Sequence, residues 1–160
     1  MNNIMIDIET AATSLDATIL SIGVVTDDGY ELYIRVDSDQ PGRAVSISTM
    51  LWWAKQDEAM HKEAFSGTMP LETALRELSE FLQPNTPFLL WAKPPHFDLG
   101  ILENAYNQHK IPVPWNFRQV SCFRTVQRLF SGVKTEPAKH SAIEDARDQM
   151  DALRGILRTL

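Results

Sequence analysis

The stretch "MIDIET", residues 5–10, places two carboxylates inside an apolar segment near the start of the chain. Successive side chains of a β-strand point to opposite faces, so Asp7 and Glu9 share one face and the isoleucines of residues 4–8 share the other. Two neighbouring carboxylates repel each other, and burying either one without a partner is costly. The stretch therefore predicts either an edge strand with a solvated acidic face or a site for a divalent cation, Mg²⁺ or Mn²⁺.

The segments that follow predict a mixed sheet. We expect strands over residues 3–8, 18–26, 30–36, 87–92 and 118–123, with a hairpin turn at 27–29. We expect helices over residues 49–56, 57–65, 70–83, 97–109, 124–130 and 142–159. Three hairpin-linked strands followed by alternating helices and strands predict an α/β fold, a mixed β-sheet with helices packed on its faces. The length of 160 residues predicts one domain, residues 1–160.

Composition narrows the class of protein. Cys122 is the only cysteine, which excludes a disulfide framework and a cysteine zinc cluster. No apolar run approaches the length of a membrane span, and no signal peptide is expected, so we predict a cytoplasmic protein without membrane contact. The net charge is −6, yet residues 110–140 hold six basic side chains and one acid. This segment is either a solvated face or a place for phosphates.

A third carboxylate lies at the head of a mid-chain helix. Asp98 falls in the first turn of the helix predicted over 97–109, on the same side as Ile101, Leu102 and Ala105. An acid in a first turn is explained by the helix dipole alone. The dipole does not explain why this acid shares the apolar side, so Asp98 is a second candidate for a metal site.

A histidine and a fourth carboxylate mark the start of the last helix. His140 precedes the helix, and Asp145 lies in its first turns beside the apolar stripe. A histidine in this place is often a surface or capping residue. Beside the three other acids, a neutral imidazole is suited to take a proton from a metal-activated water.

The ordered set D-x-E, F-D and H-x4-D resembles the pattern of the DEDDh family of 3′–5′ exonucleases. "DIETAATSLDATILSIGVV", "FDLGILENAY" and "HSAIEDA" are similar to its small phage and bacterial exoribonuclease-like branch. The resemblance implies a ribonuclease-H-like sheet with helices on both faces. It also implies two divalent metal ions, Mg²⁺ or Mn²⁺. It assigns Asp7, Glu9, Asp98 and Asp145 to the metals and His140 to the role of general base.

The same resemblance implies a substrate, the 3′ end of single-stranded RNA or DNA, and release of nucleoside 5′-monophosphates. Thr10 matches a position that contacts the terminal nucleotide, and Phe97 adjoins Asp98. Further phosphate contacts are expected from the basic segment, with Arg118, Arg124, Lys134 and Lys139 as candidates. A homodimer is expected by analogy. The stretches Ala11-Ala12 and "WAKPPH", residues 91–96, depart from the family pattern.

Two alternatives stay open at this point. The enzyme could be directed at DNA rather than RNA, because one chain does not locate contacts to a 2′-hydroxyl. The fold could also serve a binding module that has lost catalysis. Six aromatic side chains are candidates either for base stacking or for the core: Trp52, Trp53, Trp91, Trp115, Phe97 and Phe117.

Overall fold

The structure, a computed structural model, describes residues 2–85, 87–130, 132 and 134–159. Five strands form one sheet: β1 (Asn2–Thr10), β2 (Ile19–Thr26), β3 (Glu31–Arg35), β4 (Phe88–Ala92) and β5 (Val120–Cys122). The helices are α1 (Ile47–Trp53), α2 (Glu58–Ala64), α3 (Leu71–Leu82), α4 (Pro95–Gln108), α5 (Phe123–Leu129) and α6 (Ala142–Leu157), and a short 3₁₀ helix, Gln83–Asn85, follows α3.

The sheet has the strand order β3-β2-β1-β4-β5. β1 is antiparallel to β2, and β2 to β3, whereas β4 is parallel to β1 and β5 is parallel to β4. The hairpin turn between β2 and β3 has Gly29 at φ +96°, a conformation that glycine adopts without steric cost. The predicted mixed sheet is therefore confirmed, with β1 at its centre.

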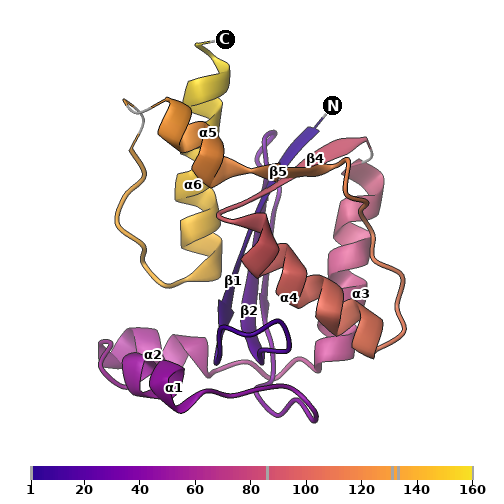
Figure 1. Cartoon of the computed structure of the whole chain (residues 1–160), viewed down its shortest axis with the longest axis vertical. Helices are drawn as coiled ribbons and strands as arrows, with labels where there is room; N and C mark the ends of the chain where they lie inside the picture. Colours follow the sequence, from indigo (N-terminus) through magenta and orange to yellow (C-terminus); the bar gives the residue numbers. More distant parts are fainter. Residues whose placement is uncertain (1, 86, 131, 133, 160) are drawn as a thin grey trace.

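Helices cover both faces of the sheet, as predicted (Figure 1). α3 and α4 pack on the face of β1 that carries Ile4, Ile6 and Ile8. α6 and α5 pack on the opposite face, against Met5 and its neighbours. α1 and α2 lie beyond the carboxyl end of β1 (Figure 1). The edge-strand interpretation of residues 5–10 is wrong, because β1 has a partner on each side.

The boundaries differ from the prediction at two places near the site. α4 begins at Pro95, two residues earlier than expected, because a proline fits the first turn of a helix, where its missing N–H has no partner to lose. The strand expected over 118–123 is only Val120–Cys122, and Phe123, which is fully buried, already begins α5. The first difference brings the start of α4 closer to the carboxyl end of β4, whereas α5 follows β5 directly, as predicted.

A β-bulge closes the pairing of β1 with β2. The register shifts between Glu9 and Thr10, so that Leu20 has no partner on β1. Leu20 instead packs in a small core with Trp53 and Ala64, which ties α1 and α2 to this end of the sheet. Bulges occur next to active sites because they end a regular ladder and redirect side chains.

Candidate metal centre

β1 turns two carboxylates toward α6. Met5, on the same face, is fully buried among apolar side chains of α6. Two and four residues further on, Asp7 and Glu9 replace that apolar contact. The amide of Gln149 on α6 donates a hydrogen bond to Asp7 Oδ1 at 3.0 Å. Along this face of β1, a buried apolar residue, Met5, is thus followed by two carboxylates at the end of the strand.

α4, the helix that follows β4, adds Asp98 to these carboxylates. Its side chain is only 3% exposed, as its place on the apolar side of the helix predicts. The β1–β4 ladder ends at Met5, and the backbone N–H of Ile8 donates to Asp98 Oδ1 at 3.1 Å. The carboxylate therefore satisfies a backbone donor that the shorter β4 leaves without a strand partner.

α6 adds Asp145, which also fixes His140. The backbone N–H groups of Lys139 and His140 donate to the two carboxylate oxygens of Asp145 at 2.8 and 3.0 Å. His140 adopts φ +55°, which is uncommon for a residue other than glycine. The hydrogen bonds to Asp145 hold this conformation, and each oxygen keeps a lone pair for another ligand.

His140, Glu9 and Asp145 converge on one point. One nitrogen of His140 and one oxygen of each carboxylate lie within 4.8 Å of one another. The imidazole ring meets the ring of Trp52 edge-on, with the ring centroids 4.6 Å apart. α1 therefore contacts the histidine ring through Trp52, and such an aromatic contact favours one ring orientation.

The carboxylates are held close to one another at an electrostatic cost. Burial, and then the negative charges of Asp98 and Glu9, raise the pKa of Asp7 well above its usual value. Burial and the charges of Asp145 and Asp98 raise the pKa of Glu9 to about 8. Burial raises the pKa of Asp98 to about 7, although the N–H of Ile8 opposes this. A bound cation would remove the repulsion that these shifts record.

The donor set fits divalent cations. Among the described residues, none of the four carboxylates forms an ion pair with lysine or arginine. Gln149 Oε1, buried beside Asp7, has no hydrogen-bond partner in that same part of the chain. Carboxylate oxygens and one imidazole suit Mg²⁺ or Mn²⁺. Asp7, Glu9, Asp98 and Asp145 are therefore the residues that could hold such ions.

Two residues that build this centre were missed by the sequence analysis. Gly23 pairs with Asp7, and a Cβ on Gly23 would lie 2.3 Å from the backbone carbonyl carbon of Ala142 at the start of α6. Only glycine lets the helix approach this closely. An isolated glycine inside a strand is itself a signal of close backbone approach. Gln149, in contrast, gives no such local signal.

The predicted substrate contacts lie in different places. Thr10 lines a pocket of about 290 Å³ with Glu9 and Trp52, but its hydroxyl donates to Ala12 O at 2.6 Å. Phe97 is half-buried and packs against the core. Arg124 lines a second pocket, of about 190 Å³, together with Asp7 and Asp145.

The other basic candidates are not brought into either pocket. Arg118 lies over the ring of Phe117, with its guanidinium carbon 5.5 Å from the ring centroid. Lys139 forms an ion pair with Asp148 at 3.0 Å. Lys134 is exposed. Of the four basic candidates, Arg124 is therefore the one that lines a pocket with Asp7 and Asp145.

Most of the tryptophans belong to the core. Trp53, Trp91 and Trp115 are buried, and each indole N–H donates to a polar acceptor: Thr10 O, Asn3 Oδ1 and Glu103 Oε1 respectively. Trp52 is 38% exposed and Phe117 82%. These two remain available to a base, and only Trp52 lies at the carboxylates.

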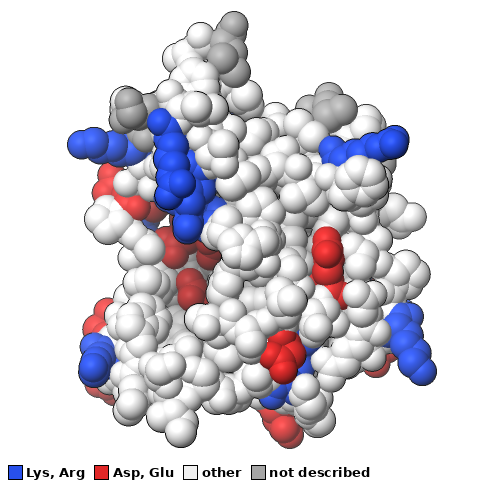
Figure 2. Space-filling view, in the orientation of Figure 1, with Lys and Arg blue, Asp and Glu red and all other residues white. Residues whose placement is uncertain are grey.

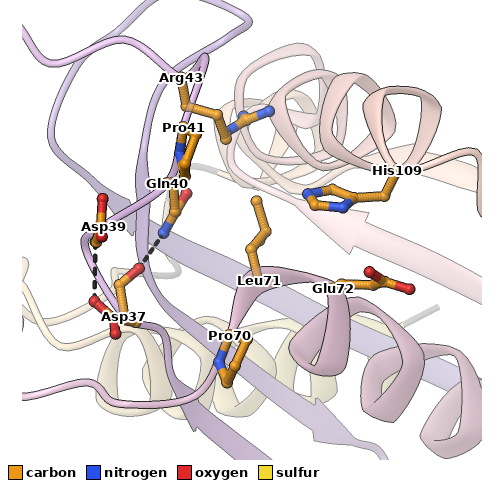
Figure 3. Close-up of a pocket in the computed structure, with 9 residues that line it drawn as sticks. All are labelled: Asp37, Asp39, Gln40, Pro41, Arg43, Pro70, Leu71, Glu72 and His109. Atoms are coloured by element: carbon orange, nitrogen blue, oxygen red, sulfur yellow. Dashed lines mark hydrogen bonds between the residues drawn. The ribbon is translucent and has the colours of Figure 1, made fainter.

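A further hollow, of about 360 Å³, lies away from this centre (Figure 3). Asp37 and Asp39 belong to the loop after β3, and Asp39 N–H donates to Asp37 Oδ1. Arg43 is the basic residue at its rim, and its guanidinium donates to Asn104 and Gln108. The guanidinium of Arg43 and the carboxylate of Asp37 therefore already have partners.

Comparisons with known proteins agree with this geometry. A family model described as "3′-5′ exoribonuclease Rv2179c-like domain" matches residues 2–157. The nuclease domain of 3′hExo, a DEDDh family member solved with rAMP, is similar at TM-score 0.64 and 12% identity, over 99% of this chain and 92% of that one. No curated protein matches the chain.

Two further solved structures share the fold. Exonuclease I of E. coli in complex with an oligonucleotide matches at TM-score 0.66 and 10% identity, over 99% of this chain and 40% of that one. Pop2p of S. pombe, in a form with bound Mg²⁺ and Mn²⁺, matches at TM-score 0.56 and 12% identity, over 96% and 82%. The ribonuclease-H-like fold expected from the sequence is confirmed.

Proposed function

We propose that this chain removes nucleoside 5′-monophosphates from single-stranded RNA with two divalent ions, Mg²⁺ or Mn²⁺. The chain belongs to the Rv2179c-like 3′–5′ exoribonuclease domain family and is a 3′–5′ exonuclease. The observation that carries the proposal is the convergence of four carboxylates and His140 at the end of β1. The alternative of a binding module without catalysis loses its support, because the family is one of enzymes.

Each of these residues has a role in the proposed reaction. Asp7, Glu9, Asp98 and Asp145 would hold the ions, which when bound would activate water and neutralise charge on the phosphate. His140 would accept the proton of the attacking water at an imidazole nitrogen, for which it has to be neutral. Asp145 would orient His140 through the hydrogen bonds that its carboxylate accepts from the backbone N–H groups of Lys139 and His140.

The pocket beside Glu9 would receive the terminal nucleoside. Its walls combine the ring of Trp52 with the hydroxyl-bearing side chains of Thr13, Ser48 and Thr49. Small-molecule sites typically pair an apolar surface with a few placed polar groups. The ring of Trp52 would contact the base or sugar, and the hydroxyl groups would contact the ribose.

Degradation of RNA and DNA oligonucleotides of one sequence, labelled at the 5′ or the 3′ end, tests this function. With Mg²⁺ or Mn²⁺ we expect a ladder of shortening 5′-labelled RNA and release of mononucleotides. Asp7→Asn and His140→Ala should abolish release. Asp151→Asn, an exposed acid on α6 paired with Arg154, is the matched control and should act as the wild type does. Equal release by Asp7→Asn would contradict the assignment.

The same assay decides the nucleic acid. Faster release from DNA than from RNA would replace RNA as the proposed substrate. The homodimer, the single domain of residues 1–160 and the cytoplasmic location stay predictions. Light scattering tests the first of these. No described helix is long and apolar enough to cross a bilayer.

A further inference from the structure

The row of carboxylates has a pocket at each end. The pocket of Thr10 and Trp52 touches Glu9, whereas the pocket of about 190 Å³ touches Asp7 and Asp145. If the pocket at Glu9 receives the terminal nucleoside, the rest of the nucleic acid, on the 5′ side of the bond that is cut, passes through the pocket at Asp7 and Asp145. Acidic side chains lie deep in a hollow of this face, and basic side chains crowd its rim near α5 (Figures 1 and 2).

Two cations stand at the carboxyl ends of neighbouring parallel strands. Lys93 directly follows β4, and Arg124 lies in the first turn of α5, two residues after β5. Ala92 and Cys122 are partners in the β4–β5 ladder, which sets the two basic residues side by side. The guanidinium of Arg124 donates to the carbonyl oxygen of Lys93 at 3.3 Å. The positions of both residues are therefore fixed by regular structure: Lys93 directly follows a strand, and Arg124 lies in the first turn of a helix.

Lys93 points into the pocket from a fixed position. Its ammonium donates to Thr135 Oγ1 at 3.1 Å and lies 5.7 Å from the ring centroid of the buried Phe123. Burial and the charge of Arg124 lower the pKa of Lys93. Two like charges are held together here, and an anion between them would relieve their repulsion.

Lys93 and Arg124 lie near carboxylates but are paired with none of them in the part of the chain that the structure describes. Within residues 2–85, 87–130, 132 and 134–159, neither Lys93 nor Arg124 forms an ion pair with a carboxylate. They share the pocket with four carboxylates, those of Asp7, Glu136, Asp145 and Asp148, of which Asp7 and Asp145 belong to the candidate metal centre and Asp148 is paired with Lys139. A phosphodiester strand whose cut bond lies at the carboxylate-bound cations would place its next phosphate within reach of these two side chains.

We propose that Lys93 and Arg124 hold the backbone phosphate on the 5′ side of the bond that is cut. This inference rests on the proposed function, because it takes the terminal nucleoside to occupy the pocket at Glu9. It assigns a role to the "WAKPPH" stretch in which the sequence departs from its family. It also makes a demand on the substrate, namely a second phosphate upstream of the cut.

Two dinucleotides that differ by one phosphate test the proposal. A dinucleotide with a 5′-hydroxyl carries only the phosphate to be cut, and its 5′-phosphorylated form adds the upstream one. The wild type should cleave the phosphorylated form with a kcat/KM higher by about tenfold or more, the effect of a charge-assisted contact. Lys93→Met and Arg124→Gln should lower this ratio toward one. A wild-type ratio of one, or an unchanged ratio in both variants, would overturn the proposal.

Two further variants separate phosphate binding from charge and from structure. Arg128→Gln removes an exposed charge from the same helix, outside the pocket, and should keep the wild-type ratio. Thr135→Val removes the hydroxyl that holds the ammonium of Lys93 but keeps the charge, so it should lower the ratio less than Lys93→Met does. A loss in Arg128→Gln as large as that in Arg124→Gln would mean that the ratio follows the net charge of the protein, and the phosphate site would be wrong.

The failure of the proposed function has a different signature. In that case the wild type cleaves neither dinucleotide, and binding of the two forms to the Mg²⁺-loaded protein then tests the phosphate site alone. Tighter binding of the phosphorylated form by the wild type, lost in Lys93→Met, would support the site. Equal binding of both forms by the wild type would overturn it.

Discussion

The two faces of β1 carry out opposite tasks with alternating residues of one strand. Ile4, Ile6 and Ile8 are buried among apolar side chains of α3 and α4 and need nothing further. Asp7 and Glu9 point the other way, and burial together with their neighbours' charges raises the pKa of both. The buried isoleucines hold β1 in place, so that the carboxylates on its other face can be kept close together to bind ligands. Active sites store local cost in this way when the surrounding fold is secure.

The largest expected effect comes from removing one charge of the acidic face. Asp7→Asn keeps the size of the side chain but should lower kcat/KM by about a thousandfold or more, because stabilisation by the metal ions is lost. Steady-state cleavage of a labelled RNA measures this. The far-ultraviolet circular dichroism of the variant should match that of the wild type, which shows that the fold is intact.

The apolar face should show the reverse behaviour. Ile6→Ala should lower the free energy of unfolding by about 2–5 kcal/mol, since it empties a fully buried site. Asp7→Ala, the next residue, should lower it far less or raise it in metal-free buffer. Urea denaturation of both variants in EDTA makes the comparison. An equal loss of stability in the two would contradict the division of tasks between the faces.

Gly23→Ala tests the close contact between β2 and the start of α6, which places Asp145 near β1. The added Cβ would meet the backbone of Ala142 and push back the start of α6. We expect a loss of about 1–3 kcal/mol of stability from overpacking, together with weaker activity. Thermal denaturation and cleavage kinetics measure the two effects. Gly155→Ala, inside α6 where a Cβ meets open space, is the control; it should keep the activity and raise the stability by about 0.5–1 kcal/mol.

A smaller effect is expected from pH. Glu9 and Asp98 have folded-state pKa values of about 8 and about 7, above their usual 4.5 and 3.8, so between these limits the folded state binds more protons than the unfolded state. Metal-free protein should therefore lose stability as the pH rises from 5 to 8. The Tm should fall by about 2–4 °C for each kcal/mol lost. Mn²⁺ should restore more stability at pH 8 than at pH 5, and Glu9→Gln should weaken the dependence on pH.

Local patterns made much of this arrangement predictable from the sequence. The alternation of residues 4–9 gave the two faces of β1, and helical spacing put Asp98 on the inward side of α4. Contacts between distant segments were not predictable. The fit of Gly23 against α6, the amide of Gln149 beside Asp7 and the pairing of Lys139 with Asp148 depend on how closely the helix packs on the sheet. The position of Lys93 beside the carboxylates was not predictable either, because its partners, Arg124 and Thr135, lie 30 or more residues away in the sequence.

Crystals of the protein soaked in Mn²⁺ provide the most direct test of the acidic face, through an anomalous difference map collected near the manganese edge. The account predicts two peaks among Asp7, Glu9, Asp98 and Asp145, with at least one of them lost in crystals of Asp7→Asn. A map without peaks at these carboxylates, in crystals that show Mn²⁺ elsewhere, would contradict it.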